Sequence, residues 1–163
     1  MRLGKKGITP VVAVAILIAI TVALVAAIAA VSSTAPTNRP APIATFSAEA
    51  SVSEGIYIYH EGGDSLYGGD IRIQTYIPSG TYQGSTYEIP SDKITNLRTG
   101  ASAYSGNIQP GDTLKVSNFY DAFCYNATYG TYYAPSVGEQ FYIEIIHKPT
   151  DKLIARVVVT VAP

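Results

Sequence analysis

The sequence predicts an α+β protein in which one long hydrophobic helix near the N-terminus is followed by an antiparallel β-sandwich. Three observations support this prediction: an apolar run at 8–31, a proline-containing segment at 32–43, and alternating apolar and polar residues in the rest of the chain. A chain of 163 residues is long enough for one ordinary domain plus an appendage. We expect a basic leader at 1–7, a helix at 8–31, a linker at 32–43 and a head at 44–163.

The apolar run has the length of a membrane-spanning helix. Residues 8–31 read ITPVVAVAILIAITVALVAAIAAV, in which only Thr9, Pro10 and Thr21 are not apolar. At 1.5 Å per residue this helix is about 36 Å long, enough for a hydrocarbon core about 30 Å thick. Pro10 fits a helix that begins near Ile8, because a proline in the first turn removes only an N–H that has no partner there.

Charged residues give the apolar run an orientation. Arg2, Lys5 and Lys6 precede it, whereas Arg39 is the only charged residue between the run and Glu49. Because basic residues collect on the cytoplasmic side of a membrane span, we expect the N-terminus in the cytoplasm and the head outside. The head is mildly acidic and therefore has no electrostatic basis for binding nucleic acid.

Beyond residue 43 the period of the apolar residues changes from helical to two, which predicts half-buried strands. The expected strands are 46–52, 55–60, 71–77, 81–89, 113–119, 140–147 and 153–161. Their number and spacing are typical of a two-sheet sandwich of immunoglobulin-like size. The side chains expected to point mainly inward are Ile56, Ile58, Ile71, Ile73, Phe141, Ile143 and Ile145. We expect a long surface loop at 121–138 and one helical turn within 91–97.

The junction between the leader and the apolar run has a specific pattern. Residues 5–7 (KKG) are followed directly by ITPVV at 8–12. This pattern resembles the class III signal peptide of archaeal type IV pilins, and HEGGD at 60–64 is similar to a His-x-Gly-Gly-Asp motif in the heads of that family. The resemblance covers residues 1 to about 77, and the leader is its most specific part.

The resemblance implies that a prepilin peptidase cuts between Gly7 and Ile8 and leaves the apolar helix on the mature chain. It implies a structural subunit of an extracellular adhesive filament, held in the membrane before assembly and polymerised by an assembly ATPase and a membrane platform. Bacterial relatives have a glutamate where this chain has Val12, so helix packing alone would set the register between subunits. An archaellin shares the leader and is the alternative within the same class.

Four alanines recur every four residues in the apolar run: Ala15, Ala19, Ala23 and Ala27. Such a row allows the backbone of a second helix to approach closely. We therefore expect these alanines to form the packing surface between subunits in a homopolymer. The alternative is that alanine is simply common in this segment.

A histidine, three acidic residues and four glycines lie between residues 60 and 70, namely His60, Glu61, Gly62, Gly63, Asp64, Gly68, Gly69 and Asp70. Carboxylates and glycine turns are what a calcium loop needs, but the spacing does not match the twelve-residue EF-hand loop. Turn formation, which Asp and Gly both favour, is the preferred interpretation. His147 is far from His60, and neither has metal-ligand spacing, so we expect no metal and no cofactor.

Residues 126–128 (Asn-Ala-Thr) form an N-glycosylation sequon, which makes Asn126 a candidate glycosylation site. Cys124, the only cysteine, is expected to be a buried apolar side chain. No pattern of catalytic residues stands out, so we do not expect an enzyme. The thirteen tyrosines provide amphipathic side chains that can bind sugars, cells or neighbouring subunits.

Two other functional classes remain open. One is a single-pass membrane-anchored binding protein, in which the helix stays in the bilayer and the leader is not removed. The other is a secreted domain, since Ala27-Ile28-Ala29 could serve as a signal-peptidase site, although the apolar run is longer than the usual 7 to 15 residues. The three hypotheses differ in the N-terminus of the mature chain.

Overall fold

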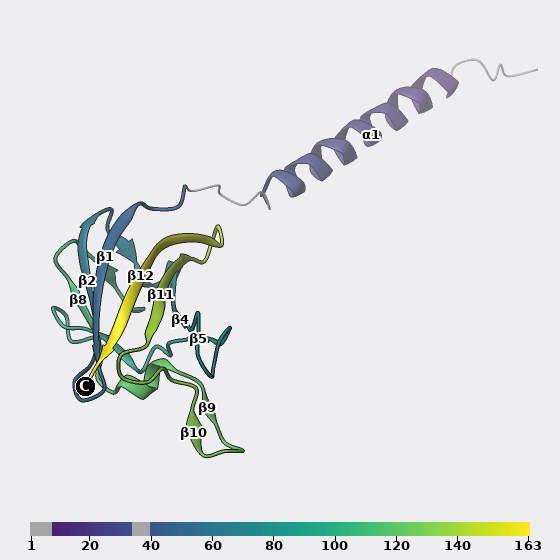
Figure 1. The fold of residues 1–163 in the computed structure, drawn as a ribbon. Helices are drawn as coiled ribbons and strands as arrows, with labels where there is room; N and C mark the ends of the chain where they lie inside the picture. Colours follow the sequence, from purple (N-terminus) through teal and green to yellow (C-terminus); the bar gives the residue numbers. More distant parts are fainter. Residues whose placement is uncertain (1–7, 34–39) are drawn as a thin grey trace, which may run out of the picture. The chain divides into compact units, whose positions relative to one another are not determined.

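The computed structural model describes residues 8–33 and 40–163. The chain divides into two compact units, Met1–Asn38 and Arg39–Pro163, and each is described by itself. The expected fold class is confirmed, because one apolar N-terminal helix is followed by a largely β-sheet domain (Figure 1).

Helix α1 extends from Ile8 to Ser33 and so begins where the sequence predicts. The hydroxyl of Thr21 donates to the carbonyl oxygens of Leu17, at 3.1 Å, and Ile18, at 2.9 Å. The one polar side chain between residues 11 and 28 is therefore satisfied by the helix itself. As a result, this part of α1 is apolar around its whole circumference.

The head contains short strands and two 3₁₀ turns within residues 40–163. The strands are β1 Ala44–Ser51, β2 Gly55–Gly63, β3 Leu66–Tyr67, β4 Ile71–Tyr76, β5 Thr86–Glu88, β6 Ile94–Asn96, β7 Asn107–Ile108, β8 Thr113–Val116, β9 Tyr125–Asn126, β10 Thr131–Tyr132, β11 Gln140–His147 and β12 Lys152–Ala162. The 3₁₀ turns are η1 Gly68–Asp70 and η2 Phe119–Ala122.

Eight of the strands form one continuous sheet in the order β5-β4-β11-β12-β1-β2-β8-β6, and β3–β7 and β9–β10 form separate pairs. The pairs are antiparallel except β1–β12, which is parallel and is registered only at Ala50–Val161 and Ser51–Ala162. This short parallel contact corrects the expectation of a purely antiparallel head. It joins two halves of the sheet, β6-β8-β2-β1 and β12-β11-β4-β5.

Alternate side chains from both halves form one hydrophobic core. The seven residues expected to point inward, from Ile56 to Ile145, are all at most 1% exposed. Phe119 and Phe123 contribute aromatic rings from the segment after β8 and lie 6.2 and 5.2 Å from the ring of Phe141. Two facing half-sheets with a shared core make the head a sandwich, as the alternation predicts.

Three local predictions need correction. Residues 91–97 contain strand β6 instead of a helical turn, because Ile94 and Asn96 alternate inward and pair with β8. Within 81–89 only Thr86–Glu88 is a strand. The expected loop at 121–138 contains the β9–β10 hairpin, whose turn includes Gly130 at a φ of 64°, a conformation that favours glycine.

A buried carboxylate ties β6 to the turn before β8. Asp112 is only 3% exposed, and both of its oxygens accept hydrogen bonds from Arg98. Asp112 Oδ2 also accepts from Asn96 Nδ2 and from the Gln109 N–H, each at 2.9 Å. The hydrogen bonds from the Arg98 guanidinium hold the pKa of Asp112 well below its usual range.

We expect Asp112→Asn to destabilise the head at pH 7 by about 1–3 kcal/mol, because the substitution removes charge-assisted hydrogen bonds in a buried site. The unfolded chain takes up a proton at this carboxyl near its ordinary pKa of 3.8, whereas the folded chain does not. The stability that Asp112 provides is therefore present above about pH 5 and falls as the pH drops further.

Thermal unfolding followed by circular dichroism from pH 7 to pH 3 measures both effects. Asp112→Asn should lower the melting temperature at pH 7 and flatten the loss of stability at acid pH. Asp151→Asn is the matched control, because Asp151 is exposed and its carboxylate forms a surface ion pair with Arg72. Identical pH profiles for the wild type and Asp112→Asn would contradict the assignment.

Candidate functional site

The first candidate site is helix α1. Its segment Val11–Ile28 is long and apolar enough to cross a membrane, by length and composition. A single such helix near the N-terminus fits a membrane anchor or a signal sequence. The described side chains from 11 to 28 are exposed, and an apolar helix without a polar face needs burial on every side, in lipid or among other helices.

The surface of α1 has two unlike rows side by side. One row contains the four expected alanines, Ala15, Ala19, Ala23 and Ala27, all within the described helix. The next row contains Val12, Ile16, Ile20, Leu24 and Ile28. Residues four apart lie in one ridge along a helix surface, so α1 presents a groove of small side chains beside a ridge of large ones.

The expected processing site falls partly outside the described part of the chain. Gly7 and the basic residues of the leader lie outside the described residues. Ile8 is the first residue of α1. A cut between Gly7 and Ile8 would therefore leave the whole of α1 on the mature chain.

The HEGGD segment lies at the end of β2. His60 stacks on Phe46 with ring centroids 4.6 Å apart and is 1% exposed. Neither of its ring nitrogens has a hydrogen-bond partner among residues 8–33 and 40–163. Asp64 Oδ2 accepts from the Ile43 N–H at 2.9 Å, and the Asp64 N–H donates to the Ile43 carbonyl at 2.8 Å. Glu61 accepts from the Ser47 hydroxyl. These residues bind separate partners and hold the end of β2 against the start of β1.

The other candidate ligands or reactive groups are His147 and Cys124. His147 is the last residue of β11, is buried, and places Nδ1 2.8 Å from the Thr150 hydroxyl. Cys124 is only half-buried, which corrects the expectation of a buried thiol. In the described part of the chain, no three His, Cys, Asp or Glu residues are placed to hold a metal ion.

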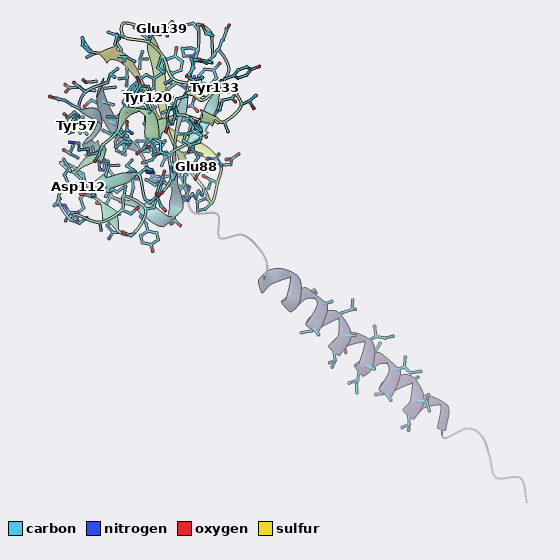
Figure 2. All side chains as sticks on the ribbon, turned by 90° about the horizontal axis from the view of Figure 1, so that it is seen from below. Tyr57, Glu88, Asp112, Tyr120, Tyr133 and Glu139 are labelled. Atoms are coloured by element: carbon cyan, nitrogen blue, oxygen red, sulfur yellow. The ribbon has the colours of Figure 1, made fainter. Side chains whose placement is uncertain are left out.

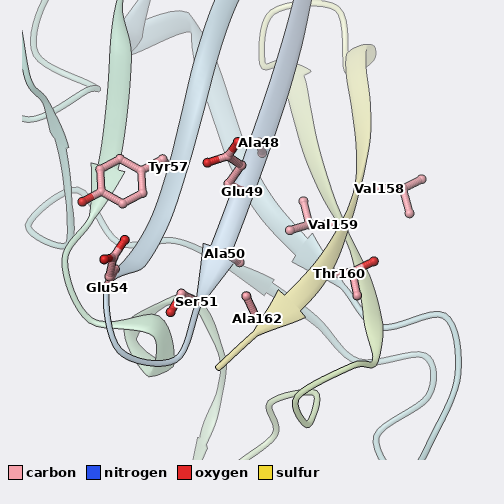
Figure 3. A pocket seen from close by; sticks show the side chains of 10 residues that line it. All are labelled: Ala48, Glu49, Ala50, Ser51, Glu54, Tyr57, Val158, Val159, Thr160 and Ala162. Atoms are coloured by element: carbon pink, nitrogen blue, oxygen red, sulfur yellow. The ribbon is translucent and has the colours of Figure 1, made fainter.

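A surface cavity of about 340 Å³ opens where β1 and β12 diverge (Figure 3). Glu49 and Glu54 line it beside Tyr57, together with small and β-branched side chains of the two strands. Glu49 also accepts a hydrogen bond from the Tyr59 hydroxyl at 3.4 Å. The residues that line the cavity include neither a histidine nor a cysteine.

Asn126 lies in β9 and is half-buried. Its Nδ2 donates to the Tyr133 hydroxyl, and its Oδ1 accepts from the N–H groups of Thr128, at 2.9 Å, and Tyr129, at 3.4 Å. A glycan would be attached to Nδ2, the atom that donates to the Tyr133 hydroxyl. Asn126 also serves to fix the conformation of the hairpin.

Sequence reasoning missed how the tyrosines gather around this hairpin. Tyr132 lies 5.4 Å from Tyr120 and 4.9 Å from Tyr125, between ring centroids. On another part of the hairpin, Tyr133 stacks with Tyr82 at 4.8 Å. The composition signalled abundant tyrosines, but only the fold brings Tyr82 and Tyr120 to those of the hairpin.

In comparisons with known proteins, the chain matches no protein-family model and no curated protein.

If Asn126 is glycosylated in the native host, the intact mass should exceed the polypeptide mass. Both Asn126→Gln and Thr128→Ala should remove the excess, because each destroys the sequon. Thr128→Ala is the cleaner variant, since it keeps the contact between Asn126 and Tyr133. Intact-mass spectrometry of native and variant proteins decides the matter, and a native protein at the polypeptide mass would reject glycosylation.

Proposed function

We propose that this protein is a structural subunit of an extracellular filament that polymerises through α1, with an adhesive head. The observation that supports the proposal most directly is the pair of unlike rows on a helix without a polar face. A helix that only crosses a bilayer needs apolar side chains, but it does not need small side chains in one row and large ones in the next.

The ridge of one α1 can pack into the alanine groove of the next copy. Such a contact joins two different surfaces of the same molecule, and repeated contacts of this kind produce an open helical polymer unless they close into a ring. Because lipid tails and helix side chains are similarly apolar, transfer from the membrane to the filament changes the hydrophobic free energy little. Close packing then favours the assembled state.

The leader would have to be removed for this assembly. Arg2, Lys5 and Lys6 are costly to carry into a core of packed apolar helices. In the proposed mechanism, a prepilin peptidase cuts between Gly7 and Ile8 on the cytoplasmic side. The subunit waits in the membrane until an assembly ATPase and a membrane platform transfer it to the filament.

A membrane-anchored binding protein is the second candidate, and the length of Val11–Ile28 favours it equally. In that case α1 stays in lipid and the mature chain begins at Met1. A secreted domain would begin near Ala30, after signal-peptidase cleavage on the far side of α1. The three candidates therefore differ in the first residue of the mature chain, which mass spectrometry can identify.

We expect mass spectrometry of the native protein to show a mature chain that begins at Ile8. Gly7→Val should block processing and abolish filaments, because the peptidase requires a small residue before the cut. Gly4→Val is the matched control, since it changes the same residue type in the leader away from the junction. Normal filaments from uncleaved Gly7→Val chains would refute the mechanism.

Ala19→Leu and Ala23→Leu should lower filament yield by about tenfold or more, because overpacking of a close contact costs about 1–3 kcal/mol. Electron microscopy counts the filaments, and membrane fractionation checks that the variants still insert. Ala26→Leu is the control, because it adds the same bulk outside the alanine row. Equal yields from all three variants would show that the alanines have no special role.

A further inference from the structure

We propose that the head binds a neutral glycan in a tyrosine-lined pocket formed by the 81–85 turn and the β9–β10 hairpin. The pocket has a volume of about 470 Å³. Three tyrosines line it, Tyr82, Tyr129 and Tyr133, with the polar side chains of Gln83, Ser85 and Thr131. The site lies entirely within the head, so the proposal does not depend on filament assembly.

The aromatic wall of the pocket is fixed in place before any ligand binds. Tyr82 packs against the hydrophobic core and stacks with Tyr133, with 29° between the ring planes. Tyr133 is held by the Asn126 side chain and by its own N–H, which donates to the Cys124 carbonyl at 2.8 Å. A preorganised wall of this kind avoids the cost of ordering side chains on binding.

The turn that carries Tyr82 has a hydrogen-bonded backbone and exposed polar groups. The Gly84 N–H donates to the Ile77 carbonyl at 2.8 Å, and the Ser85 N–H donates to the Tyr82 carbonyl at 3.1 Å. These bonds fix the backbone and leave the amide of Gln83 exposed to solvent. Tyr129 is 77% exposed and provides a free ring at the rim.

This lining selects a ligand class. The face of an aromatic ring is electrically negative and attracts the slightly positive C–H groups on the flat side of a sugar ring. Hydroxyl and amide side chains can exchange hydrogen bonds with sugar hydroxyls. No charged side chain lines this pocket, and its volume falls within the range of small-ligand sites, about 300–1,000 Å³. The chemistry therefore fits a short segment of a neutral glycan.

A nearby carboxylate disfavours acidic sugars. A side chain at Gly80, the residue before the pocket-lining turn, would meet Glu139 Oε1 at 3.1 Å, which places this carboxylate beside the turn. A uronic acid or sialic acid bound next to it would meet a like charge. We therefore expect the site to discriminate against anionic glycans.

The pocket lies at the end of the head opposite to the start of β1 at Ala44. Ser51, at the other end of β1, pairs with Ala162 of β12. The start of β11 lies near this end, because Gln140 pairs with Thr160 of β12. Tyr76, paired with Tyr142 near that same end, is followed by residues 77–80 and then by the 81–85 turn. Figure 1 shows the β9–β10 hairpin projecting there, and Figure 2 labels Tyr133 in the head as seen from below.

Saturation-transfer NMR on the full-length protein tests the proposal. The protein should be produced in a host without N-glycosylation, so that a glycan on Asn126 cannot occupy the neighbouring pocket, and kept in a detergent without a sugar headgroup. The probes are cellobiose, maltose, α-1,2-mannobiose, N,N′-diacetylchitobiose and, as the anionic probe, digalacturonic acid.

We expect saturation transfer to at least one neutral disaccharide and little transfer to digalacturonic acid. Tyr129→Ala and Gln83→Ala should each weaken binding, Tyr129→Ala by about tenfold or more, because it removes an aromatic contact. Both side chains are exposed, so circular dichroism should show an intact fold. Tyr67→Ala, at a tyrosine that is 56% exposed on β3, is the control and should bind like the wild type.

Three results would overturn the proposal. The first is the absence of transfer to every neutral disaccharide. The second is unchanged binding in both Tyr129→Ala and Gln83→Ala. The third is digalacturonic acid binding as well as the neutral probes, which would show that the lining does not select for charge.

Discussion

The head depends on strand β1 belonging to both halves of the sheet. Along its length β1 pairs with β2, and at its end Ala50 and Ser51 meet Val161 and Ala162 of β12. Without this joint the two half-sheets would be separate layers held only by their side chains. With it, the first and last strands of the head are hydrogen-bonded to each other and the two half-sheets enclose one hydrophobic core. The loops at the pocket end of the head are therefore fixed relative to one another.

Helix α1 imposes the complementary constraint, because it cannot remain exposed in water. Every described position from 11 to 28 presents an apolar surface except Thr21, whose hydroxyl is bonded to the helix backbone. Burial on all sides is possible in a bilayer or in a bundle of identical helices. The proposed roles divide accordingly: membrane insertion or assembly is assigned to α1, and ligand binding is assigned to the head.

Sequence reasoning predicted the parts of the fold whose signals are local and repetitive. Strand β4 alternates between buried and half-buried residues along its whole length, and β11 alternates up to Ile143, beyond which both of its faces are buried. Strand β6 was missed because its inward residues are Ile94 and Asn96, and a buried asparagine bonded to Asp112 breaks the apolar alternation. Strands β9 and β10 have only two residues each, too few for a period to be seen.

Contacts between distant segments could not be predicted, because no local pattern encodes them. The parallel joint of β1 with β12 links residues more than a hundred positions apart. The tyrosine pocket likewise combines the 81–85 turn with the 129–133 segment. Sequence composition indicated tyrosines suited to adhesion, whereas the position of the pocket depends on how the two half-sheets close.

The register of β1 has a mechanical consequence. If the head is held at its pocket end while the chain ahead of Ala44 is pulled, the load runs along the axis of β1. The hydrogen bonds between β1 and β2 are perpendicular to the strands, so they are sheared together instead of being opened one at a time. Eight residue pairs from Ala44–Gly63 to Ser51–Gly55 share the force. Strand β1 is thus loaded along its own axis, the direction in which a pair of hydrogen-bonded strands resists rupture best.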